Sequence, residues 1–114
     1  MTDRKVTVNE RATQLRVDEI RALDHFCHLL EASFGERPYL VGSAITRPDY
    51  RDVDVRVPLD DEAYEAIPLE VLDLNMLLSQ WGQRVSGLPI DCQVQRLSEF
   101  QAATGPVNPR GLIR

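Results

Sequence analysis

Asp52-Val53-Asp54-Val55-Arg56-Val57 is the stretch that decides the fold of this 114-residue chain. Alternate side chains of a β-strand point to the same face, so the three valines would share a buried face. Asp52, Asp54 and Arg56 would then share the opposite face. Two carboxylates that are fixed close together on one strand repel each other unless a cation lies between them. The stretch therefore predicts a β-strand that has one face buried in the core and a metal site on its opposite face.

A later segment, Leu88-Pro89-Ile90-Asp91-Cys92-Gln93-Val94, supplies a third carboxylate. Its apolar residues alternate with polar ones, which predicts a strand over residues 90–95 with Asp91 on the outward face. The chain from Asp52 to Gln95 has the strand–helix–strand pattern of a crossover between parallel neighbouring strands. Asp91 would then lie beside Asp52 and Asp54, and three carboxylates provide the hard oxygen ligands that Mg²⁺ or Mn²⁺ prefers.

The remaining pattern predicts one small α/β (α+β) domain with a mixed sheet of about three strands flanked by helices. Apolar residues recur at spacings of three and four in two segments, which is typical of amphipathic helices. Gly35 and Gly87 would end these helices. The expected elements, in chain order, are a helix from Asp18 to about Phe34, a strand over 39–41, a strand over 52–57 that stops at Pro58, one or two helical turns over 60–66, a long helix beyond Pro68, a strand over 90–95 and a short helix over 98–103.

Composition excludes several classes of protein. No run approaches the roughly 20 apolar residues that a membrane span needs, and no secretion signal stands at the N-terminus, so we expect a cytoplasmic protein without a membrane partner. The net charge of −5 argues against tight non-specific binding to nucleic acid, so a nucleic-acid partner is possible but not favoured. Cys27 and Cys92 are expected to be buried free thiols.

The run Leu40-Val41-Gly42-Ser43, an eight-residue loop and then Asp52-Val53-Asp54-Val55 resembles the signature of the DNA polymerase β-type nucleotidyltransferase superfamily. Asp91 fits the third acidic residue of that signature. The chain is similar in size to the minimal nucleotidyltransferases of this superfamily. The resemblance implies a nucleotidyltransferase-like domain over residues 18–104, preceded by a polar N-terminal arm (1–17) and followed by a C-terminal tail (105–114).

The same resemblance implies a function. It implies a metal-dependent enzyme that transfers a nucleoside monophosphate from a nucleoside triphosphate to an unknown acceptor hydroxyl. Gly42 and Ser43 would hold the triphosphate, and Asp52, Asp54 and Asp91 would bind Mg²⁺ or Mn²⁺ and carry catalysis, with Asp91 acting as the base or positioning it. Minimal nucleotidyltransferases often pair with a helical protein in toxin–antitoxin operons. An apolar stripe at Leu69, Leu72 and Met76 would supply a surface for such a partner or for a homodimer.

Other interpretations of these residues stay open. Arg47, Arg51 and Arg56 would grip phosphate or would only neutralise the neighbouring aspartates. Gly42-Ser43 is also a common turn, and the aspartates would simply face water in a plain structural domain. Ala44 departs from the family pattern, in which an arginine often follows Gly-Ser. The alternative function is therefore a catalytically inactive domain that binds nucleotide or a protein partner.

His25 and His28 lie three positions apart in the first predicted helix, a spacing that places two side chains on one side of a helix. No third ligand of matching spacing accompanies them. Solvated helix residues are the more ordinary interpretation, and no metal site is assigned to this pair.

Overall fold

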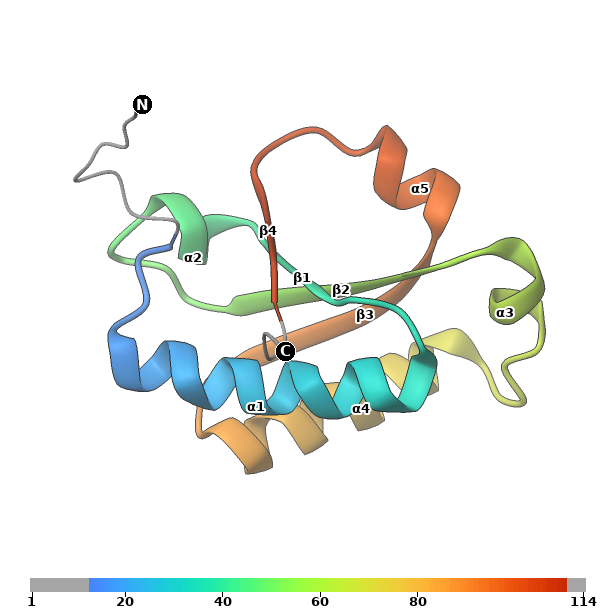
Figure 1. Ribbon diagram of the computed structural model, residues 1–114, viewed down its shortest axis with the longest axis horizontal. Helices are drawn as coiled ribbons and strands as arrows, with labels where there is room; N and C mark the ends of the chain where they lie inside the picture. Colours follow the sequence, from blue (N-terminus) through green and yellow to red (C-terminus); the bar gives the residue numbers. More distant parts are fainter. Residues whose placement is uncertain (1–12, 111–114) are drawn as a thin grey trace.

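The computed structural model describes residues 13–110, and it confirms an α/β fold with a mixed sheet (Figure 1). The elements are α1 (Val17–Phe34), β1 (Tyr39–Val41), α2 (Ser43–Thr46), β2 (Val53–Leu59), α3 (Asp61–Glu65), α4 (Val71–Ser86), β3 (Ile90–Arg96), α5 (Leu97–Ala102) and β4 (Val107–Pro109). None of the helices in this range combines the length and the apolar composition of a membrane span.

The sheet has the strand order β3-β2-β1-β4. The short strand β1 pairs antiparallel with β2, while β2 pairs parallel with β3 through the connection that contains α4. The parallel pairing of β2 with β3 confirms the predicted crossover. The parallel pair is the one that matters for the site, because it sets β2 and β3 side by side in a fixed register.

Helices α1 and α4 lie on one side of the sheet, and α5 lies on the other (Figure 1). The valines of β2 face α1 and α4, and Val53, Val55 and Val57 are all fully buried. On the same side the rings of Phe26 and Trp81 meet edge to face, with centroids 5.4 Å apart. The core therefore occupies one face of the sheet, as the alternation of β2 predicts.

Helix α4 also closes the outer edge of the sheet. A polar side chain on every fourth residue of α4 forms a hydrogen bond with the outward main-chain groups of β3, which would otherwise be open to pairing with another strand. The donors and acceptors are Asn75 Oδ1 with Val94 N (2.8 Å), Ser79 Oγ with Cys92 N (2.8 Å) and Cys92 O (3.3 Å), and Gln83 Nε2 with Ile90 O (3.0 Å).

The C-terminal ends of α1 and α4 lie where the sequence predicts them. Helix α1 ends at Gly35 and α4 ends at Gly87, and both glycines have the left-handed conformation of a C-terminal cap. The prediction that β2 stops at Pro58 is wrong, because β2 continues to Leu59 and Pro58 pairs with Gln95. Strand β1 begins at Tyr39, opposite Arg56, so β2 has no β1 partner at Pro58 and tolerates a residue without an N–H group there.

A fourth strand replaces part of the predicted tail. Val107–Pro109 forms β4, which pairs antiparallel with β1. The following residue, Arg110, is not a free terminal side chain: its Nε lies 2.9 Å from Oδ1 of Asp24 on α1, and both side chains are less than a fifth exposed. This ion pair fixes β4 against the first helix. Arg114 and residues 1–12 of the predicted arm lie outside the described residues.

Candidate metal centre

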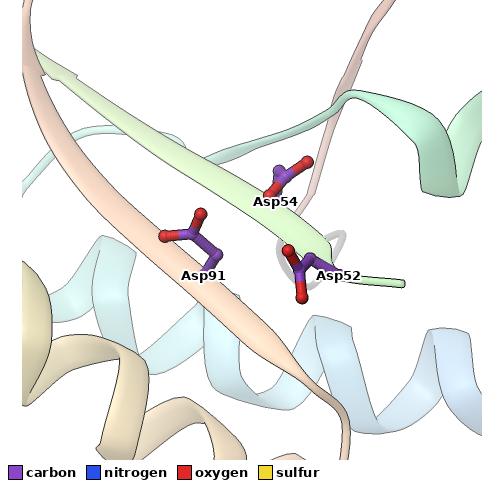
Figure 2. A group of neighbouring side chains, drawn as sticks. All are labelled: Asp52, Asp54 and Asp91. Carbon is purple, nitrogen blue, oxygen red and sulfur yellow. The ribbon is translucent and has the colours of Figure 1, made fainter. Parts of the chain in front are cut away.

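The register of the parallel pair β2–β3 builds the acidic site. Asp54 is the direct partner of Asp91 across the two strands, and Asp52 stands just before the first residue of β2. One carboxylate oxygen from each of the three lies within 4.8 Å of the others. Figure 2 shows the three side chains at these neighbouring strands. The aspartates that the sequence separates by almost forty positions therefore form one cluster, as predicted.

The cluster is electrostatically unfavourable without a cation. Asp52 is exposed, whereas Asp54 and Asp91 are half-buried. Burial raises the pKa of the Asp54 carboxyl, the charges of Asp91 and Asp52 raise this pKa further, and the guanidinium of Arg56 lowers it. The net direction is upward, so burial and carboxylate repulsion together outweigh the one nearby positive charge. A bound divalent cation would reverse this balance.

The geometry of the cluster suits a small divalent ion. Two oxygens bound to one Mg²⁺ are at most about 4.2 Å apart, since each Mg–O bond is about 2.1 Å long. The observed limit of 4.8 Å exceeds this by a fraction of an ångström. A difference of this size is within the reach of small side-chain rotations. Carboxylate oxygens are also the ligand type that Mg²⁺ and Mn²⁺ prefer.

Gly42 lies against the cluster. Its φ of +80° is rarely adopted by other residues, and a Cβ built there would lie 2.5 Å from Oδ2 of Asp54. Any side chain at this position would therefore displace the Asp54 carboxylate. The sequence identified Gly42 through the Gly-Ser motif, but its contact with Asp54 depends on the pairing of β1 with β2 and is seen only in the fold.

A cavity of about 340 Å³ opens on one side of the cluster. Ser43, Arg47 and Arg51 line it together with Asp52 and Asp54. The guanidinium of Arg47 forms an ion pair with Asp49, also a lining residue, at 3.0 Å. The predicted residues Ser43 and Arg47 thus lie beside the acids, and the structure adds Asp49 and Tyr50, which sequence reasoning missed because loop residues carry no periodicity.

Arg56 occupies a different place from the loop arginines. Its Nη1 donates hydrogen bonds to the main-chain oxygens of Val55 (3.0 Å) and Asp91 (3.2 Å). It lines a second cavity of about 340 Å³, which also includes Gly42 and Asp54. Phe100 of α5 and the loop that leads into β4 complete the walls of this second cavity. Asp54 therefore lies at the boundary of two cavities.

The histidines of α1 take no part in this site. Within residues 13–110, Asp52, Asp54 and Asp91 form the one group of three or more histidine, cysteine or acidic side chains that could hold a metal ion. Both cysteines are buried free thiols, as predicted. Comparison of the chain with protein-family models, curated proteins and solved structures finds no significant match in any of the three.

Proposed function

We propose that this protein is a metal-dependent nucleotidyltransferase that transfers a nucleoside monophosphate from a nucleoside triphosphate to an acceptor hydroxyl. One observation carries the proposal: three carboxylates from two neighbouring strands converge to within 4.8 Å beside a cavity that two arginines line. Carboxylates that hold Mg²⁺ or Mn²⁺ next to arginine side chains are suited to a substrate with several phosphate groups.

The first cavity is the proposed place for the phosphates. Ser43 offers a hydroxyl donor, and Arg47 and Arg51 offer guanidinium groups. A phosphate would compete with the exposed Asp49 for the Arg47 guanidinium, which can bind phosphate through two charge-assisted hydrogen bonds. Helix α2 has four residues, too few for a substantial helix dipole, so the arginines carry the attraction here.

A bound Mg²⁺ or Mn²⁺ would neutralise negative charge on the attacking and leaving oxygens. Asp52, Asp54 and Asp91 would hold the ion, and Asp91 would also accept the proton of the acceptor hydroxyl. The acceptor oxygen then forms a bond with the α-phosphorus, while the bond from that phosphorus to the oxygen bridging it to the β-phosphorus breaks. Pyrophosphate leaves on the side of Ser43 and the loop arginines. The second cavity has room for the organic part of a substrate next to Asp54.

The test is a titration of Mn²⁺ and Mg²⁺, with and without ATP, that follows the melting temperature. Ligands that bind only the folded state raise this temperature. We expect stabilisation by metal that increases with ATP and disappears in Asp54→Asn. Glu62→Gln is the matched control, since it also removes one negative charge but lies on α3, outside the cluster. Transfer of labelled nucleotide to protein, RNA and small alcohols then tests catalysis.

Ala44 favours a second candidate function, binding of metal and nucleotide without transfer. In the superfamily that the sequence resembles, an arginine often holds this position, whereas Ala44 is fully buried. A buried alanine gives the phosphates no charge. In the same experiment, ATP-dependent stabilisation without label on any acceptor would favour this second candidate, and no stabilisation of the wild type by either metal would contradict both.

A further inference from the structure

Helix α4 carries a group of large apolar side chains on its solvent side. Leu72 is 81% exposed, Met76 is 54% exposed and Leu77 is 52% exposed, and Leu69 lies just before the helix with 39% exposure. Leu72 and Met76 are four positions apart and share one face of α4, Leu77 widens this face, and Leu69 lies outside the helix just before it. Exposed apolar groups of this kind mark contact surfaces more often than scattered single residues do.

Two opposite charges flank this apolar surface at the two ends of the helix. Asp73 lies in the first turn of α4 and Arg84 lies in the last turn. They are about three helical turns apart, so both project from nearly the same side of the helix. Both residues are exposed, and among the described residues neither one forms an ion pair or a side-chain hydrogen bond. Each charge is therefore available to a partner.

We propose that the exposed surface of α4 binds a second copy of this chain, with the two α4 helices antiparallel. Reversal of the helix direction sets Asp73 of one copy opposite Arg84 of the other, and the same contact repeats on the other side of the two-fold axis. This axis crosses the helix near Leu78 and Ser79. Met76 and Leu77 then lie close to this axis, where the two copies are in contact. A symmetric dimer requires a surface that is complementary to itself, and this arrangement provides one.

The charge pattern makes α4 complementary to a second copy of itself. An acidic first turn and a basic last turn match themselves only in the antiparallel orientation, whereas a parallel pair would set like charges opposite each other. Asp54 and Asp91 alternate along β2 and β3 with the buried residues, so the cluster of aspartates lies on the face of the sheet opposite the core. The association therefore leaves both acidic sites accessible, and it does not depend on the proposed function.

The experiment measures the mass of the full chain in solution by sedimentation and light scattering over a range of concentrations. We expect a dimer of the 12.9 kDa chain for the wild type and a monomer for Leu77→Glu, with unchanged circular dichroism because Leu77 is exposed. Leu97→Glu is the control: Leu97 is also an exposed apolar residue, but it lies on α5. A wild type that stays monomeric up to roughly 1 mM, the weak end of specific binding, would overturn the proposal.

A charge exchange tests the orientation. Asp73→Arg alone would set two arginines opposite each other and should weaken the dimer by at least tenfold in Kd. The double variant Asp73→Arg with Arg84→Asp restores opposite charges across the axis and should recover most of the affinity. A double variant as weak as the single one would overturn the antiparallel arrangement, as would a dimer that Leu77→Glu does not disrupt.

Discussion

The two faces of the β2–β3 pair differ in almost every physical respect. On one face, Val53, Val55 and Val57 of β2 and their neighbours on β3 are buried under α1 and α4. On the other face, Asp54, Arg56 and Asp91 carry charge beside two cavities. The same backbone register produces both faces, because the side chains of a strand alternate.

The difference shows that the valine face stabilises the fold, while the charged face is available for ligand binding. A fully buried valine contributes roughly 1.5–3 kcal/mol through the hydrophobic effect. The polar face contributes repulsion instead, and burial holds the pKa of Asp54 above its usual value. A local arrangement that costs stability, on a strand that is otherwise well packed, is expected where a ligand binds. The four variants and conditions below test this division, in order of expected effect.

Val55→Asp should disrupt the packing of the apolar face. Val55 is fully buried in the centre of β2, so the new carboxylate would have no water and no positive partner there. We expect a loss of about 4 kcal/mol or more in the free energy of unfolding, enough to leave much of the protein unfolded. Urea denaturation followed by circular dichroism measures it, and a variant with wild-type stability would show that this face does not form the core.

Gly42→Ala should disturb the acidic cluster on the polar face, with a smaller loss of stability than Val55→Asp. The added Cβ would clash with Oδ2 of Asp54, and alanine is also strained at this positive φ. We expect a loss of about 1–3 kcal/mol in stability and at least tenfold weaker binding of Mn²⁺. Gly105→Ala is the control, because Gly105 has a positive φ but no atom within 4 Å of its built Cβ. Equal metal affinity in both variants would contradict the contact between Gly42 and Asp54.

Asp54→Asn should stabilise the metal-free protein. Asparagine keeps the shape of the side chain but removes the cost of burying its charge and its repulsion with Asp91 and Asp52, while its attraction to Arg56 is lost. The raised pKa of Asp54 shows that the unfavourable contributions are larger, and because solvent screens this half-buried carboxylate in part, we expect a gain of up to about 1 kcal/mol. Thermal unfolding in EDTA measures it. A lower melting temperature than that of the wild type would contradict this account of the polar face.

The advantage of Asp54→Asn should decline at acid pH. Because the folded pKa of Asp54 is raised, the folded state binds a proton more readily than the unfolded state, whose pKa is about 3.9. The destabilising charge is fully present above the folded pKa and is lost as pH falls through it. The stability difference between wild type and variant in EDTA should therefore shrink between pH 7 and pH 4. A difference that is constant over this range would mean that Asp54 does not titrate as described.

The sequence predicted the apolar face and the three acids well, because period-two alternation reports directly on which side chains share a face of a strand. It did not predict β4. Strand β4 has only three residues and its apolar residues Val107 and Pro109 are exposed, so no buried apolar pattern marks this strand. Its position depends on pairing with β1 and on the ion pair of Arg110 with Asp24, two residues that are far apart in the sequence.

The sequence also did not predict which residues surround the candidate site. The second cavity needs Phe100 and the loop before β4, and it exists only because the chain returns across the polar face of the sheet. The placement of Arg56 depends on the main-chain oxygen of Asp91, which belongs to a neighbouring strand. Local patterns thus identified the residues that carry charge, while long-range strand pairing determined which of them meet.

The most direct measurement is an anomalous difference map from a crystal of this protein grown with Mn²⁺. The account predicts one peak that carboxylate oxygens of Asp52, Asp54 and Asp91 all contact at about 2.1–2.3 Å, close to the Mg–O distance. Crystals that hold no manganese between these three carboxylates at millimolar Mn²⁺, or that hold it elsewhere, would contradict the claim that the polar face is a metal centre.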